Sequence, residues 1–270
     1  MVAAIQAPAS AQVQTKSAEA ARAQVQALIE KYAGHGRPDY TGLESALSKA
    51  GTTNFRISNP DLASTPQTAT EMQRLWDQSN PEHSNGAAGT VTPMSVPTDA
   101  FKVIGYSGHG DWADPLGVDY YITTWGFRDT YVNGSAPDDV VAFAVESYDR
   151  NCYGSMAIDD YNTWVATQGQ RYPNLMLLSD QTSTSVIYGI RDQTSGFVLY
   201  PQNGQIWAEV PWINHSNCTR DTRGSGWYEH NQDGGGSWSA SVSFLGLSVT
   251  YSGGAPALLR KSTGLMEVQY

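Results

Sequence analysis

The spacing of apolar residues changes near residue 100. Over residues 15–33 apolar residues recur at intervals of three and four, which predicts an amphipathic helix that stops at Gly34. A threonine followed three residues later by glutamate, at Thr41 and again at Thr68, is typical of a helix N-terminus. The first part of the chain is therefore predicted to be helical.

After residue 100 the apolar residues gather in short segments rich in β-branched and aromatic side chains. Turn residues such as Asn-Gly separate them, and no amphipathic helix intervenes. The main segments are 101–106, 118–127, 139–149, 185–192, 197–204 and 205–212. This spacing predicts antiparallel strands in a sandwich or partly closed barrel, not βαβ units. The expected fold class is mainly β with a helical N-terminal region, α+β overall.

Composition divides the chain into four parts. Residues 1–14 are expected to be disordered or the remnant of a signal or pro-segment, and residues 15–78 form the helical region. Residues 79–100 are rich in Pro, Gly, Ser and Asn, as in linkers, and residues 101–270 form the β-rich domain.

Two features favour a secreted protein. Ala9-Ser10-Ala11 is similar to the small-x-small pattern cleaved by signal peptidase. Cys152 and Cys218 are the two cysteines, and a disulfide between them would close a loop of about 67 residues, worth roughly 4 kcal/mol in the chain-entropy model. Two separate buried thiols are the alternative.

Charge and hydropathy exclude some partners. The chain has 16 basic and 26 acidic residues, a net charge of −10 that repels nucleic-acid phosphates and anionic lipids. No nucleic-acid partner is expected. No run of about 18 apolar residues occurs, so no transmembrane helix is predicted.

Residues 237–251 alternate serine with apolar residues. The apolar positions are even up to Phe244 and odd from Leu245 onward. A change of parity is typical of a β-bulge, which predicts one bent strand bulged near Gly246. A membrane-inserting hairpin is the alternative. The expected return strand carries Arg260 and Lys261, and a charge facing lipid costs roughly 2–4 kcal/mol, which favours the bulged strand.

One glycine-rich segment contains candidate catalytic residues. Gly105 to Gly110 is similar to the G-x-S-x-G nucleophile elbow of the α/β-hydrolases, which makes Ser107 a candidate nucleophile. His109 stands where that motif has glycine, and the fold expected here lacks helix–strand alternation. A glycine-rich turn is the alternative. His109 and Asp111 are further catalytic candidates.

The same segment offers candidate metal ligands. His109, Asp111 and Asp114 supply imidazole and carboxylate groups that would suit Ca²⁺ or Zn²⁺. Their spacing does not match an EF-hand, and a solvated acidic turn is the alternative. No other cofactor is expected.

Aromatic and polar residues mix in residues 209–236, which are predicted to form a loop. Aromatic side chains there could stack on sugar rings while their polar neighbours donate hydrogen bonds. The candidate ligand-binding residues are Trp212, His215, Trp227, Tyr228 and His230. Tryptophans that fill a β-rich core are the alternative.

Three function classes remain after these exclusions. The first is a secreted, non-catalytic protein that contacts glycans or a cell surface through its polar-aromatic loops. The alternatives are a β-pore-forming, toxin-like protein and a secreted hydrolase with its site around His109 and Asp111.

Overall fold

The computed structural model describes most of the chain. The described residues are 9–34, 37–80, 101–112, 116–127, 139–146, 148–167, 170–172, 176–190, 193–194, 197–198, 203–214, 218, 221–231, 237–251 and 258–270.

The N-terminal region contains helices whose ends follow local capping chemistry. They are α1 (Ala9–Ala33), α2 (Tyr40–Lys49) and α3 (Ala69–Ser79). The Thr68 side chain accepts a hydrogen bond from the backbone N–H of Glu71, which confirms the cap predicted for α3. In α2 the cap is Asp39, which accepts from the N–H of Gly42, and not Thr41.

The first sheet, sheet A, consists of antiparallel strands in the order β1-β2-β3-β12-β6-β7, with the short β5 also paired to β12. Their bounds are β1 (Thr52–Ser58), β2 (Phe101–Gly110), β3 (Val118–Phe127), β5 (Ala157–Ile158), β6 (Trp164–Thr167), β7 (Gln170–Tyr172) and β12 (Asn203–Pro211). β1 lies inside the segment 15–78 that was predicted to be helical. Phe55 and Ile57 of β1 are buried and its backbone pairs with β2, which places this seven-residue strand at the edge of the sheet.

The second sheet, sheet B, runs in the order β16-β13-β4-β9-β8, and β17 also pairs with β13. Its strands are β4 (Asp139–Val145), β8 (Met176–Gln181), β9 (Ser185–Ile190), β13 (Thr222–Asn231), β16 (Leu258–Ser262) and β17 (Met266–Val268). Two further ladders stand apart: β10 (Gln193–Thr194) with β11 (Phe197–Val198), and β14 (Trp238–Ser243) with β15 (Gly246–Tyr251).

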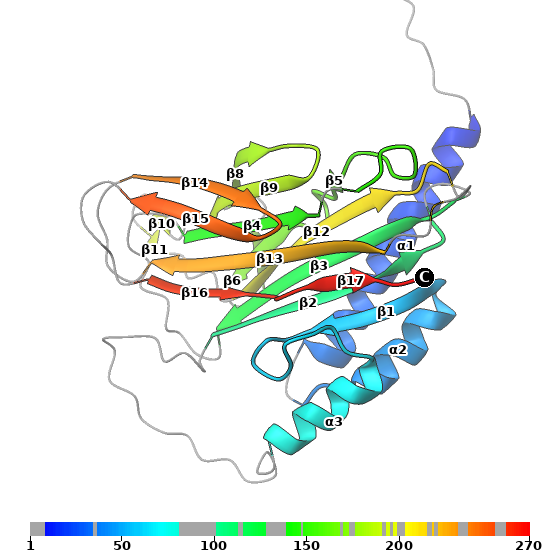
Figure 1. Cartoon of the computed structure of the whole chain (residues 1–270), viewed down its shortest axis with the longest axis horizontal. Helices are drawn as coiled ribbons and strands as arrows, with labels where there is room; N and C mark the ends of the chain where they lie inside the picture. The colour runs from blue at the N-terminus through cyan, green and yellow to red at the C-terminus, as the bar shows by residue number, and fades with distance from the viewer. Residues whose placement is uncertain are drawn as a thin grey trace, which may run out of the picture.

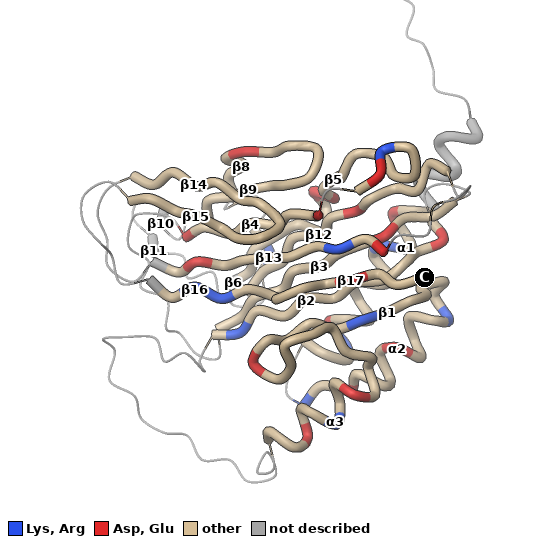
Figure 2. The backbone as a smooth tube through the Cα atoms, viewed as in Figure 1, with Lys and Arg blue, Asp and Glu red and all other residues tan. Residues whose placement is uncertain are grey.

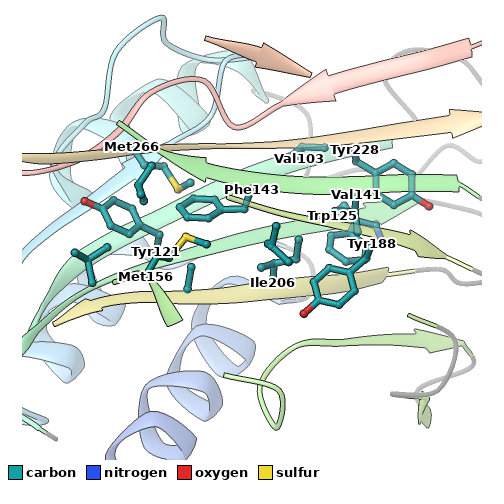
Figure 3. Close-up of a cluster of buried hydrophobic side chains, with 14 of the residues drawn as sticks. Val103, Tyr121, Trp125, Val141, Phe143, Met156, Tyr188, Ile206, Tyr228 and Met266 are labelled. Atoms are coloured by element: carbon teal, nitrogen blue, oxygen red, sulfur yellow. The ribbon is translucent and has the colours of Figure 1, made fainter. Parts of the chain in front are cut away.

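The elements stack in four layers (Figure 1). The helices cover the outer face of sheet A, where Leu43 and Leu47 of α2 pack with Ile122 and Trp207. Sheets A and B enclose the main core, which includes the ten side chains labelled in Figure 3. The β14–β15 hairpin covers the outer face of sheet B. The predicted fold class is confirmed, as an α+β protein with open antiparallel sheets.

Strand β4 shows how the layers determine burial. All seven of its residues are buried, although antiparallel strands often leave one face in water. Val141 and Phe143 face the main core, whereas Val140, Ala142 and Ala144 face the hairpin. The unbroken apolar run in β4 is therefore explained by cover on both sides.

Candidate functional site

Residues 237–251 form a tight hairpin. β14 and β15 pair antiparallel from Trp238–Tyr251 to Ser243–Gly246, which leaves Phe244 and Leu245 as a two-residue turn. The prediction of one bulged strand is therefore wrong. A parity change at two successive residues is what a two-residue hairpin produces, because paired residues lie on the same face.

The hairpin has one apolar and one hydroxyl face. The apolar side chains pack on the outer face of sheet B: Trp238, Ala240, Val242, Leu247 and Val249. The alternate residues are exposed and are all serine or threonine: Ser239, Ser241, Ser243, Ser248 and Thr250. This alternation is the pattern of a strand pair with lipid or protein on one side and water on the other.

No strand ladder joins the hairpin to sheet B within the described residues. β14 and β15 pair only with each other there, so their ladder of backbone–backbone hydrogen bonds is internal. The hairpin is held through side chains: the apolar contacts, a hydrogen bond from Tyr251 to Glu229 of 3.0 Å, and one from Arg260 to the Leu247 carbonyl of 2.8 Å. Lifting it away would break no ladder among the residues that the structure describes.

The hairpin and the β13–β16 pair share one register. Their facing ends are the pairs Asn231–Leu258 and Trp238–Tyr251. Six residues separate these pairs on each strand, 232–237 on one and 252–257 on the other. Equal spacing on both strands means that one continuous ladder could join the two pairs without a slip. In Figure 1 the hairpin is instead folded back over sheet B.

The hairpin carries no charge and has an apolar tip. Residues 234–259 contain no Asp, Glu, Lys or Arg, and the β14–β15 tube in Figure 2 is tan throughout. Leu245 at the turn is 91% exposed, the most exposed of the large apolar side chains described. Arg260 and Lys261, which had counted against membrane insertion, lie in β16 and pair with sheet B. They are outside the uncharged segment.

The candidate nucleophile Ser107 is buried in β2. Its hydroxyl donates to the backbone carbonyl of Glu267 at 2.9 Å. Ser107 therefore lies in a regular strand and not at a strained strand–helix turn, so the hydroxyl has a structural role there.

His109 belongs to a buried polar cluster around Asp119. The Asp119 carboxylate is fully buried and lies 2.9 Å from Nδ1 of His109. It also accepts from Trp212 Nε1 at 2.9 Å, from Thr222 Oγ1 at 2.6 Å and from the Tyr270 hydroxyl. Burial and the neighbouring Asp119 raise the pKa of Tyr270 well above its ordinary value, which keeps the phenol a hydrogen-bond donor.

Asp111 lies at the rim of that cluster. Its carboxylate is 3.6 Å from Nε2 of His109, and its side chain is 72% exposed. Asp114 lies outside the described residues. Within the described ranges no group of three or more His, Cys, Asp or Glu side chains is placed to hold a metal ion. The candidate set of His109 and Asp111 thus has no third ligand there.

The expected aromatic loop is largely strand β13. Trp227, Tyr228 and His230 lie in it and are buried. Trp227 packs beneath the hairpin, while the Tyr228 hydroxyl and the His230 ring bond to the buried Asp139. The prediction of a loop is wrong for these three residues, because β13 pairs with β4 on one side and with β16 and β17 on the other.

The remaining ligand-binding candidates from that segment are Trp212 and His215. Trp212 is buried against Tyr153 and Tyr270, and its indole N–H is bonded to Asp119. His215 lies outside the described residues. Contact with glycans stays a prediction. The candidate residues that the structure describes, Trp212, Trp227, Tyr228 and His230, are buried.

The predicted disulfide between Cys152 and Cys218 is present. It joins two segments 66 residues apart, beside the buried Tyr153 and Trp212. No helix in the described part of the chain is long and apolar enough to cross a membrane.

Comparison with known proteins gives no assignment. No family model matches the chain, and no curated protein is significantly similar to it in sequence.

The sequence contained the signal for the hairpin. The two alternating runs, the two apolar residues between them and the glycine clusters on either side all lie in residues 234–254. The change of parity at Phe244 and Leu245 fits both a bulge in one strand and a turn between two strands, and the pairing of β14 with β15 shows that it is the turn.

Proposed function

We propose that this protein permeabilises membranes by inserting the β14–β15 hairpin into the bilayer, where hairpins from several copies close a β-barrel. The observation that carries the proposal is an uncharged, two-faced hairpin that no strand ladder joins to sheet B in the described part of the chain. An apolar face would meet lipid, and the serine and threonine face would line a water-filled lumen.

The length of the hairpin supports insertion. Extended in the register of β13 and β16, its strands would comprise residues 232–243 and 246–257, twelve each, with the charged Asp233 at the end farthest from the turn. At about 3.3 Å per residue this reaches about 40 Å. A tilted transmembrane strand needs about 9–11 residues to cross a hydrocarbon core about 30 Å thick.

The backbone chemistry also favours it. In lipid every N–H and C=O needs a protein partner, and the hairpin already pairs its two strands with each other. The outer edges would be paired by neighbouring hairpins. The smallest membrane barrels have about eight strands, so at least about four copies are needed.

The setting we propose is extracellular. The disulfide is typical of oxidising compartments, where a protein can meet a cell surface from outside. This joins the predicted secretion to the second of the three function classes.

The test uses charge at the exposed tip. Leu245→Asp should slow dye release from phospholipid vesicles roughly 70- to 400-fold, because the tip must carry its carboxylate across the hydrocarbon core, where a charge at the centre costs about 2.5–3.5 kcal/mol. Since Leu245 is 91% exposed, the substitution removes no packing from the folded protein.

The matched control is Ser241→Asp. It places the same charge on the exposed hydroxyl face of β14, which would line the lumen, and should retain most of the activity. Circular dichroism should show both variants folded. Equal rates for the two variants, or no release by the unaltered protein from zwitterionic, anionic and sterol-containing vesicles, would refute the proposal.

A further inference from the structure

An ion pair with a buried carboxylate lies under the hairpin. Glu229 in β13 is fully buried and is the direct cross-strand partner of Arg260 in β16. Nε and Nη2 of Arg260 contact the same carboxylate oxygen, Oε2. Opposite charges directly across a ladder attract. The Glu229 carboxylate is out of water, whereas the Arg260 side chain is 41% exposed.

The pair reaches the hairpin through two hydrogen bonds. Oε1 of Glu229 accepts from the Tyr251 hydroxyl at 3.0 Å, and Nη1 of Arg260 donates to the Leu247 carbonyl at 2.8 Å. Both partners are in β15. The other contacts of the hairpin with sheet B described above are apolar.

The surroundings keep these bonds in one protonation state. Burial and the nearby Glu229 raise the pKa of Tyr251 well above its ordinary value, so the phenol remains a donor. Asp139 and His230 are also close, but they bond to each other at 2.9 Å. Lys261 turns away and pairs with Asp61.

We propose that Glu229 and Arg260 are positioning residues that act as a releasable latch on the hairpin. Under the docked hairpin the two ions are satisfied by each other, by Tyr251 and by the Leu247 carbonyl. When the hairpin lifts, the buried Glu229 carboxylate regains hydration, which makes release easier than from a wholly apolar interface.

The shared register supports the second state. In a continuous ladder Glu229 would lie on the same face as Ser239 and Ser241, since residues two apart share a face. That is the proposed water-filled side of the barrel. The Glu229 carboxylate, which is buried while the hairpin is docked, would therefore be exposed to water when the hairpin is extended. The function of the latch rests on the proposed insertion, whereas its presence can be measured in solution.

The experiment introduces one thiol beneath the hairpin. The two native cysteines form the disulfide, so Leu247→Cys supplies the reactive group at a hairpin side chain that is buried against sheet B. Its rate of labelling by a maleimide, without lipid, reports how often the hairpin lifts.

Breaking and replacing the pair should have opposite effects. Arg260→Met leaves Glu229 buried without its cation and should accelerate labelling roughly tenfold or more. The double change Glu229→Met with Arg260→Met replaces the ions by apolar side chains and should label at or below the parent rate. Tyr251→Phe, which keeps the pair, should give a several-fold increase.

Lys261→Met is the matched control, since it removes the neighbouring cation that does not contact the hairpin, and its rate should equal the parent's. Near-ultraviolet circular dichroism checks that each variant folds. If Arg260→Met does not fold, the labelling rate of Tyr251→Phe tests the latch in its place. Unchanged labelling in Arg260→Met, or a double variant that labels as fast as the single one, would overturn the latch.

Vesicle assays separate the two proposals. With the latch and the insertion both correct, Arg260→Met should release dye faster than the parent and the double variant more slowly. The predicted labelling order without dye release from any variant would support the latch and refute the pore.

Discussion

At the scale of single residues, the buried carboxylates of this protein are each matched by several donors. Glu209 accepts from Arg22 at 2.8 Å and from two indole N–H groups, each at 3.1 Å. Asp119 and Glu229 follow the same rule with different partners. A buried carboxylate is tolerated only when its lone pairs are satisfied, so these residues organise their surroundings.

Asp119 provides a test at this scale. Asp119→Asn should lower the free energy of unfolding by at least about 3 kcal/mol, because it removes a buried charge that several donors share. Urea denaturation measures the change. Asp111→Asn alters a largely exposed carboxylate in the same region and should cost no more than about 0.5 kcal/mol. Similar losses in both variants would contradict the role given to Asp119.

At the scale of elements, β4 and the hairpin depend on each other. Val140, Ala142 and Ala144 are buried because β14 and β15 cover them. The small alanines let the hairpin approach the sheet closely. A strand that is apolar on both faces therefore indicated a further layer, although β4 alone did not say which segment forms it.

Removing the hairpin tests that dependence. Replacing residues 232–257 by Asn-Gly joins Asn231 to its partner Leu258 through a turn suited to a two-residue hairpin. The protein should fold, but the uncovered face of sheet B should bind a hydrophobic dye and promote self-association.

The control for this deletion replaces Phe244 and Leu245 by the same Asn-Gly turn and keeps both strands of the hairpin. It should bind no more dye than the parent, as measured by fluorescence and by light scattering. Equal dye binding by the deletion and the control would show that the hairpin does not shield sheet B.

At the scale of the whole molecule, the disulfide links segments that are distant in sequence. Cys152 and Cys218 are separated by 66 residues and pack beside the main core. Replacing both by serine should lower the free energy of unfolding by about 2–5 kcal/mol, because the unfolded chain gains freedom. Urea unfolding with and without the disulfide measures this. A change below about 1 kcal/mol would mean that the core alone fixes these segments.

Local patterns were enough for several elements. The sequence predicted the end of α1 before Gly34, the threonine cap of α3 and the whole of β3, 118–127. Each depends on neighbours within a few residues, either a capping side chain or the alternation of one strand. The fold class followed from the same information, because short strands without helices between them pair antiparallel.

Other features depended on tertiary contacts. β1 is a strand because β2 offers it a sheet edge, and Trp227 and His230 are buried because layers cover both faces of β13. His109 meets Asp119 only through the pairing of β2 with β3.

By itself the sequence determined that residues 237–251 alternate, lack charge and carry Phe244 and Leu245 at the change of parity. Alternation is a local property and fixes which side chains share a face. Only the tertiary structure decided that the segment is a hairpin, folded back on sheet B and in register with β13 and β16. Strand pairing and docking join residues far apart in the chain, and no local pattern specifies that partner.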